Sequence, residues 1–424
     1  MGTVGQYAIV GNVGVVPAGT ATTSLDRLAL ACVYGLVMAV PCEEAVPAIG
    51  GLVVTRWLGL AAFAVVLFRA AWSGVVRKIS PLHTCMLALV TWSGASLIWS
   101  VAPSETVARL GTYAQVLVMA LMIWEVAVTN DRILLLLQAY VFGTYIAAVM
   151  TIYDAVQAQA NSTDVERYAA GTFNENDLGI LLALSIPMSL YLLSRRRTMP
   201  LLKALYWTHF PVCVLAILFS GSRGAVLAAT VGSVSAVFMA TRWSARQRAA
   251  CLGMVAGVAL LLTYIVPSPV WDRVLSIGTE VTQGTLTHRT QIWNAAAEVA
   301  QMHPLIGVGA AAFPTSVAST LDVPFVAHNT FISIFVELGV IGALIFCMLM
   351  FGLFYSALRL HGLDRILWVF MLMTWVVGVS SVTWEYHKPT WVLFGLLAAR
   401  AALPKSTDDG VEDRIRFFIP DTAL

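Results

Sequence analysis

Apolar runs of about twenty residues recur along the whole chain, and they constrain its fold more than any other feature. Each run is close to the ~20 residues that cross the hydrocarbon core of a bilayer as an α-helix. Hydrophobic residues make up 59% of the 424 residues and charged residues only 11%, whereas a soluble domain carries roughly 25% charged residues. The sequence therefore predicts an all-α polytopic membrane protein.

The apolar runs and their polar flanks predict about twelve spans, with ten or eleven as alternatives because the first and last runs are short. The spans are expected near residues 25–41, 53–72, 82–100, 107–127, 133–154, 177–193, 204–220, 224–241, 250–268, 329–357, 366–383 and 390–403. Together they predict one transmembrane domain over residues 25–403. A flexible tail (1–24) would precede it, and a cytoplasmic tail (404–424) would follow.

Basic residues indicate how the spans are oriented. Lys and Arg cluster in every second connection, which the positive-inside rule assigns to the cytoplasm together with both termini. Seven of the 25 Lys and Arg residues fall at the opposite, external end, namely Arg56, Arg109, Arg167, Arg223, Arg273, Arg289 and Lys388. Positive charge on that side runs against the rule, so these residues are candidates for a function.

Two long connections are both external, over residues 155–176 and 269–328. The second is long enough to hold structure of its own. Within it, residues 291–302 combine helical propensity with a mixed face, and the sequence HPLIGVG then ends the helix. This pattern predicts a short helix along the outer membrane surface.

Four polar groupings lie at the external end. Arg167 begins RYAAGTFNENDLG, a stretch that contains Asn176 and runs directly into a span. Arg223 lies in GSRGA, between two predicted helices, and Arg289 lies in THRTQIW, just before the surface helix. His328 begins the motif HNTFISIFVELGVIG, where the long loop enters the membrane.

These residue types favour a particular chemistry. A guanidinium group offers fork-like donors that match phosphate oxygens and stays charged at any working pH. A neutral histidine is the usual proton acceptor near neutral pH. The sequence shows no paired carboxylates and no metal-binding motif. The set therefore predicts a site for an anionic, phosphorylated amphiphile that needs neither metal nor cofactor.

Alternative interpretations apply to several residues. Arg56, Arg109 and Arg273 are expected to contact lipid headgroups. His328 alone is also compatible with a helix cap, with Asn329 as a supporting neighbour. Glu337 is expected to be buried and hydrogen-bonded, or to orient a catalytic group. The stretch Trp384–Trp391 (WEYHKPTW) is typical of an interfacial aromatic belt, with His387 and Lys388 as alternative substrate contacts.

The order of these motifs resembles that of a known family. HNTFISIFVELGVIG, preceded by HRTQIW and HPLIGVGAAAF, resembles the signature region of the O-antigen ligase and Wzy polymerase superfamily. GTFNENDLGILLAL and GSRGA resemble its upstream motifs, in the same order. The motifs extend over about residues 167–345.

The resemblance implies a GT-C-like membrane fold and an enzyme that transfers glycans from undecaprenyl diphosphate at the periplasmic face of the bacterial inner membrane. By motif match, His328 would be the base, Arg223 and Arg289 would bind the donor diphosphate, and Arg167 would be a third contact. The implied partners are the lipid-linked glycan donor, a glycan or lipid A-core acceptor, the lipid bilayer, and the flippase and chain-length regulator of the same pathway. No basic cluster interleaved with aromatic residues suggests nucleic acid.

Three functions remain open from the sequence. A polymerase would join one lipid-linked repeat unit to another, and a ligase would move a finished chain onto lipid A-core. The compact external loops favour the polymerase. A transporter or flippase for lipid-linked oligosaccharide is less consistent with the sequence, because transporters keep ionisable groups near the bilayer midplane and these span interiors carry almost no charge.

Overall fold

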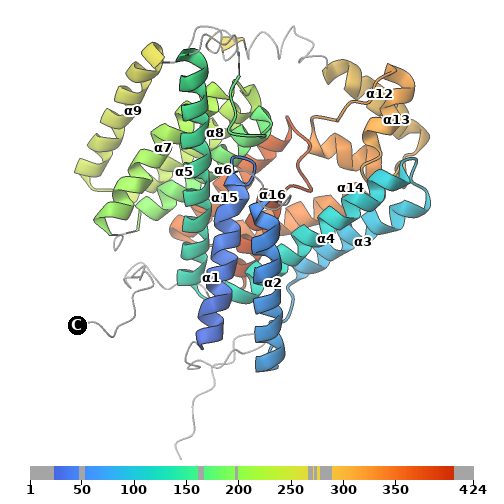
Figure 1. Cartoon of the computed structure of the whole chain (residues 1–424), viewed down its shortest axis with the longest axis horizontal. Coiled ribbons are helices and arrows are strands. Elements are labelled where there is room, and N and C mark those ends of the chain that lie inside the picture. The colour runs from blue at the N-terminus through green and yellow to red at the C-terminus, as the bar shows by residue number, and fades with distance from the viewer. Residues whose placement is uncertain are drawn as a thin grey trace, which may run out of the picture.

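The computed structural model describes residues 23–46, 53–160, 167–195, 199–265, 271, 275–276 and 289–404. Over these ranges the chain forms helices and connections without strands (Figure 1). The two predicted tails, residues 1–24 and 404–424, lie almost wholly outside the described residues.

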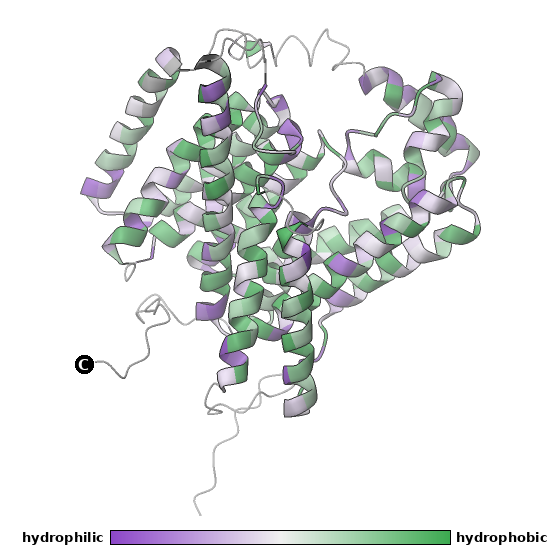
Figure 2. Ribbon diagram, viewed as in Figure 1, coloured by the Kyte–Doolittle hydropathy of each residue, from purple (hydrophilic) through white to green (hydrophobic). Residues whose placement is uncertain are grey.

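Eleven described helices are long and apolar enough to cross a membrane, which confirms the predicted all-α polytopic fold. Figure 2 shows the hydrophobic residues that line these long helices. The helices are α1 (Ser24–Ala39, extended by the 3-10 turn Val40–Cys42), α2 (Val54–Ser73), α3 (Pro81–Ala95, extended by Ser96–Ile98), α4 (Pro103–Val126), α5 (Asn130–Ala160), α6 (Glu175–Leu193), α7 (Pro200–Phe219), α8 (Arg223–Met239, extended by Ala240–Arg242), α9 (Ala245–Ile265), α14 (Thr330–Leu358) and α15 (Gly362–Val379).

The twelfth predicted span corresponds to α16 (Lys388–Ala401). Its 14 residues extend about 21 Å as an α-helix, less than the ~30 Å hydrocarbon core. From Pro389 to Arg400 every residue of α16 is buried. It packs against α4, where an added Cβ at Gly395 would lie 3.2 Å from the Cα atom of Ala120. The last apolar run is therefore an internal helix, surrounded by the longer ones.

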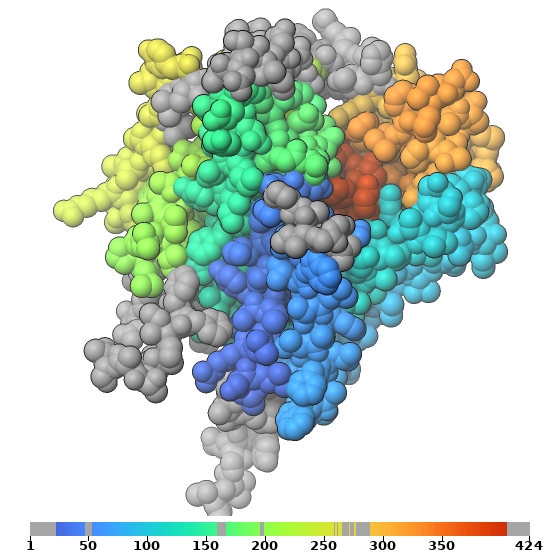
Figure 3. Space-filling model, in the orientation of Figure 1, coloured from blue at the N-terminus to red at the C-terminus, as the bar shows by residue number. Residues whose placement is uncertain are grey.

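The centre of the bundle is α6, which is buried from Leu178 through Leu193. It packs against α5, α7, α8 and α15. Glycines allow the close approach, since an added Cβ at Gly378 of α15 would lie 2.8 Å from the side chain of Ile180. At the surface, α1 and α2 lie side by side, as the space-filling view shows (Figure 3).

The alternating chain direction defines two ends of the bundle, which we call the His328 end and the Arg77 end. Helices α2, α4, α6, α8, α14 and α16 begin at the His328 end. Two short helices, α12 (Arg289–Met302) and α13 (Phe313–Leu321), come between α9 and α14 in sequence and lie beside α14 at the same end (Figure 1). The predicted helix over 291–302 is therefore present, and it begins two residues earlier.

Candidate functional site

His328 lies in the last turn of the connection before α14, in an unusual backbone conformation. Its φ angle is +48°, in the left-handed region. This conformation costs a non-glycine residue about 1–3 kcal/mol and persists only where the surrounding structure fixes it. The next residue, Asn329, caps α14, because its side-chain oxygen accepts hydrogen bonds from the backbone N–H groups of Phe331 (3.0 Å) and Ile332 (3.1 Å). His328 is thus set directly before the helix N-terminus and is only partly buried.

Hydrogen bonds on both sides hold this conformation. On the N-terminal side, the indole N–H of Trp293, on α12, donates to the backbone oxygen of Ala327 at 2.9 Å. On the C-terminal side, the Asn329 amide donates to the backbone oxygen of Ser380 (3.1 Å). The Thr330 hydroxyl donates to the backbone oxygen of Val382 (3.0 Å). The motifs around Arg289 and His328, far apart in sequence, are therefore joined to each other and to the connection between α15 and α16.

Arg223 is the first residue of α8 and lies against the same connection. Ser222 caps the helix by accepting a hydrogen bond from the N–H of Ala225 at 3.4 Å. At Gly224 an added Cβ would lie only 2.0 Å from the hydroxyl oxygen of Ser381. Glycine is needed here because α8 begins in contact with the α15–α16 connection, and this contact places Arg223 beside it.

Arg167 is held by the ends of two neighbouring helices. Its Nε donates to the backbone oxygen of Ser220, after α7, at 2.9 Å. A second guanidinium nitrogen donates to the side-chain oxygen of Asn176 at 2.9 Å, and a third lies 3.4 Å from Glu175. Asn176 therefore has a defined contact: it helps to fix Arg167 at the start of α6.

Electrostatic effects connect the four predicted residues. Burial lowers the pKa of Arg289, and the positive charges of Arg223 and Arg167 lower it further. Burial also lowers the pKa of His328, with a second contribution from the charge of Arg289. The structure thus brings the three arginines and the histidine close enough to influence one another, with the imidazole kept neutral near pH 7.

Three helix N-termini add to this positive potential. Helices α6, α8 and α14 all begin at the His328 end, capped by Asn174, Ser222 and Asn329. A helix N-terminus carries about half a positive charge and attracts anions. Among the described residues, no group of three or more His, Cys, Asp or Glu side chains is arranged to hold a metal ion.

Glu337 supports the connection before α13. It is buried, and its carboxylate accepts a hydrogen bond from the backbone N–H of Ala311 at 2.8 Å, while its backbone oxygen accepts one from Gly309 at 2.9 Å. The helix is kinked two residues later, at Gly339, where φ is +66°. The HPLIGVG and VELGVIG segments therefore pair through their backbones. Glu337 is therefore buried and hydrogen-bonded, as predicted, and its contacts fix the loop before α13.

The stretch Trp384–Trp391 does not form an interfacial belt, so that prediction is wrong. Trp384 and Trp391 are each only 1% exposed. The backbone N–H of Trp384 donates to the Thr330 hydroxyl at 2.8 Å, and the indole of Trp391 donates to the backbone oxygen of Glu385 at 2.8 Å. The connection between α15 and α16 folds into the bundle, which removes its aromatic residues from the membrane surface.

The prediction that Arg109 contacts lipid headgroups is wrong. Arg109 is instead the partner of a buried acid. Its guanidinium lies 3.1 Å from Glu385 and 3.5 Å from the ring centroid of Tyr386. Burial raises the pKa of Glu385 to about 7, and the charge of Arg109 opposes this shift. Glu385 was not singled out from the sequence, because no local pattern links it to Arg109, 276 residues away.

The other predicted contacts have different surroundings. His387 stacks on Trp384, with ring centroids 5.4 Å apart, and burial lowers its pKa to about 3. Lys388 forms an ion pair with Glu43 and donates to the Thr55 hydroxyl at 3.0 Å. Both are therefore bound within the protein. Arg56 lines a groove beside Lys388, and Arg273 lies outside the described residues.

The fold and these residues together define a multi-pass membrane protein with a cluster of three arginines and a histidine at one end of its helices. Residues 210–347 match the family model described as O-antigen ligase. This match, over about a third of the chain, supports the resemblance to the O-antigen ligase and Wzy superfamily that the motifs predicted. No curated protein matches the chain.

Proposed function

We propose that this protein is a polysaccharide polymerase. It would join oligosaccharide repeat units, carried on undecaprenyl diphosphate, into exopolysaccharide or O-antigen at the periplasmic face of the inner membrane, with both of its termini in the cytoplasm. The observation that carries the proposal is the gathering of His328 with three arginines at one end of the bundle. A donor with an anionic leaving group and an acceptor hydroxyl would use both kinds of side chain.

In the proposed reaction, His328 is the general base. An acceptor hydroxyl oxygen attacks the anomeric carbon of the donor sugar, and the imidazole takes the hydroxyl proton. The bond between that carbon and the diphosphate oxygen breaks, and its electron pair leaves with the diphosphate. The lowered pKa of His328 suits this role, because the ring is neutral and able to accept a proton at pH 7.

Arg223 and Arg289 are the proposed diphosphate clamp. Negative charge grows on the leaving oxygens as the bond breaks, and fixed cations stabilise that charge without reorganisation. Arg167, already held by Glu175 and Asn176, would be a third contact at the edge of the clamp. The reaction needs no metal ion, since the sugar is already activated by its diphosphate.

The test uses the purified full chain in nanodiscs with a lipid-linked donor and acceptor of one repeat unit. His328→Ala should slow polymer formation about 10²–10⁴-fold, while the labelled donor still binds. The matched control is His361→Ala, which alters an exposed histidine at the Arg77 end and should keep full activity. Full activity of the purified His328→Ala protein would contradict the assignment of His328 as the general base.

The second candidate is a ligase that transfers the chain from the same carrier to lipid A-core. The description of the matching family, O-antigen ligase, favours it. A deletion strain separates the two functions, since they use the same donor chemistry. Single repeat units on lipid A-core without polymer would indicate the polymerase, whereas uncapped core with intact carrier-linked polymer would indicate the ligase.

Labelling of single cysteines tests the proposed orientation. Cysteine placed at positions 167, 223, 289 or 328, in a variant without the six native cysteines, should react with an impermeant reagent added from the periplasm. Reaction only from the cytoplasm would reverse the topology and exclude a periplasmic site.

A further inference from the structure

A groove of about 490 Å³ opens between α1, α2 and α4, apart from the arginine site. Its volume lies within the range of small-ligand sites, roughly 300–1,000 Å³. Most of its wall is apolar and comes from side chains such as Leu36, Leu60, Phe63, Met119 and Met122. Unbranched methionine side chains adapt to ligands of irregular shape. The groove therefore suits a flexible apolar chain.

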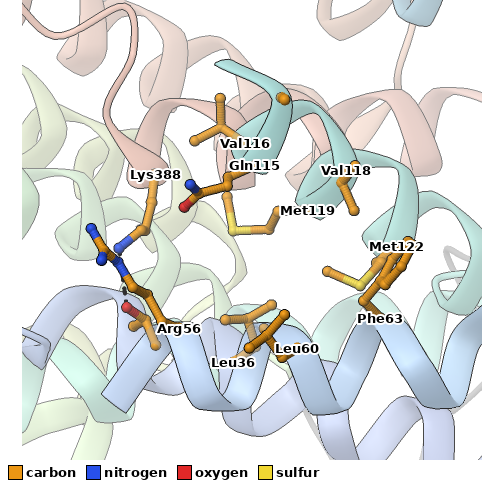
Figure 4. A pocket seen from close by; sticks show the side chains of 13 residues that line it. Leu36, Arg56, Leu60, Phe63, Gln115, Val116, Val118, Met119, Met122 and Lys388 are labelled. Carbon is orange, nitrogen blue, oxygen red and sulfur yellow. Dashed lines mark hydrogen bonds between the residues drawn. The ribbon is translucent and has the colours of Figure 1, made fainter. Parts of the chain in front are cut away.

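The polar lining residues lie at one end of this groove. Figure 4 shows Lys388 and Arg56 close together, with the amide of Gln115 directed toward them and with Phe63 and Met122 at the opposite end. Gln115 lies midway along the spanning helix α4, is exposed, and makes no hydrogen bond to another described residue. An amide without a hydrogen-bond partner at membrane depth is unfavourable, so a ligand with polar atoms would stabilise it.

Of the two cations at the polar end of the groove, one has no carboxylate partner among the described residues and could bind an anionic ligand. Lys388 is paired with Glu43 and bonded to Thr55, so its charge is largely compensated. Arg56 is exposed near the start of α2 and has no ion pair within the described ranges. Its guanidinium offers donors that match phosphate oxygens. A ligand with one apolar chain and a phosphate group at one end complements this arrangement.

We propose that the groove binds the polyprenyl-phosphate portion of the acceptor's carrier lipid; this rests on the proposed polymerase function. A polymerase must hold two lipid-linked substrates at once, and the arginine site accounts for only the donor diphosphate. The groove provides the second site. A groove of about 490 Å³ fits one isoprenoid chain better than the several acyl chains of a lipid A-core acceptor.

The α15–α16 connection joins the two sites. Its first residues contact the helix starts that carry the arginine site, through Ser380 with Asn329 and Ser381 with Gly224. At its other end the connection leads into α16, and the first residue of that helix, Lys388, lines the groove. A carrier phosphate bound at Arg56 would therefore lie at the other side of this connection from His328, with its glycan free to extend toward the base.

The test compares two positions on one face of α2. Leu60 lines the groove and is 60% exposed, whereas Leu67 is 55% exposed and lies outside the groove. Seven residues apart, they share a helix face. The photoreactive residue p-benzoylphenylalanine is placed at either position in the full chain, in nanodiscs of phosphatidylglycerol and phosphatidylethanolamine, with radiolabelled undecaprenyl phosphate as the probe.

Capture at position 60 should exceed capture at position 67 about tenfold, and Arg56→Gln should reduce it by a similar factor. Leu60→Trp, which fills the groove, should slow polymerisation at low substrate concentration, and Leu67→Trp should not. Equal capture at both positions, or loss of capture when the phosphatidylglycerol fraction of the nanodiscs is raised, would show that ordinary membrane lipid occupies the groove and would overturn the proposal.

Two further variants separate this proposal from the proposed function. Arg289→Ala should leave capture at position 60 unchanged; loss of capture would mean that the groove holds the donor's own chain and not the acceptor's. His328→Ala should be inactive and still capture the probe. An active His328→Ala protein would exclude the polymerase mechanism without affecting the capture result, whereas an inactive one with no capture would exclude only the groove.

Discussion

The helix bundle surrounds its arginines differently around Arg289 than at the Arg77 end. At the Arg77 end, two arginines are compensated by carboxylates: Arg69 lies 2.7 Å from Asp26 and 3.3 Å from Glu125, and Arg400 donates to Asp364 at 2.7 Å. At the His328 end, the charges that act on Arg289 are those of two other arginines. The same residue type is thus used to tie helices together at one end and to concentrate charge at the other.

This difference indicates which charges serve the fold. A buried cation beside a carboxylate is neutral as a pair and connects two helices. Like charges held together repel each other, and the fold must offset that repulsion. An anionic ligand would remove the repulsion at the His328 end. Arg109 shows that position alone does not decide the role, because it lies at the His328 end and is paired with Glu385.

The largest expected effect is on activity at the His328 end. Arg289→Ala should reduce polymer formation by about 10²–10³-fold, since a fixed donor to the leaving group is lost. It should leave the thermal unfolding midpoint in detergent unchanged or slightly higher, because a repulsive charge is removed. The measurement is the initial rate on a lipid-linked donor, together with the unfolding curve. A lower midpoint with an unaltered rate would make Arg289 a structural residue like those at the Arg77 end.

The next effect is on stability at the Arg77 end. Arg400→Ala leaves the buried Asp364 without its cation, and breaking a buried ion pair typically costs about 3–5 kcal/mol. The midpoint of thermal unfolding should fall, while the rate per folded molecule stays the same. Arg359→Ala is the matched control, because Arg359 is exposed at the same end. Equal midpoints for the two variants would contradict the contrast between the ends.

The sequence predicted the part of the molecule that depends on local patterns. The apolar runs predicted the spanning helices, and the motifs around Arg167, Arg223, Arg289 and His328 all lie at or just before helix starts, so one orientation brings them to one end. Pairings across the fold were not predictable. Arg109 and Glu385 are 276 residues apart, and neither lies in a local sequence pattern that identifies its partner.

The burial of α16 was missed for a similar reason. A run of apolar residues has the same appearance whether lipid or protein surrounds it, and only its length of 14 residues hints that longer helices enclose it. The aromatic residues of Trp384–Trp391 were assigned to the membrane surface because their burial depends on Thr330 and on α4, which are distant in sequence.

A smaller effect is expected when the side chain at position 289 keeps its positive charge but loses the planar guanidinium group. Arg289→Lys should retain more activity than Arg289→Ala and still be at least about tenfold slower than the native protein, because an ammonium group cannot provide two parallel donors to a diphosphate. The comparison requires initial rates of both variants at saturating donor. A lysine variant with the native rate would show that only the charge matters, as in a simple ion pair.

The smallest effect concerns pH and follows from the charge that Arg289 places beside His328. Burial and that charge lower the pKa of His328 below its ordinary value of 6.5, so the neutral, basic form persists as the pH falls. Between pH 7.5 and 6.5 the rate should therefore decrease less than about twofold, and the acid limb should lie below pH 6.5. In Arg289→Ala the nearby charge is absent, so the limb of the residual activity should move to higher pH. Arg289→Lys keeps the charge and should keep the native limb. The profiles of kcat/KM, which report groups of the free protein, decide the point, since an acid limb at the same pH in all three proteins would mean that the titrating group is not His328 beside Arg289.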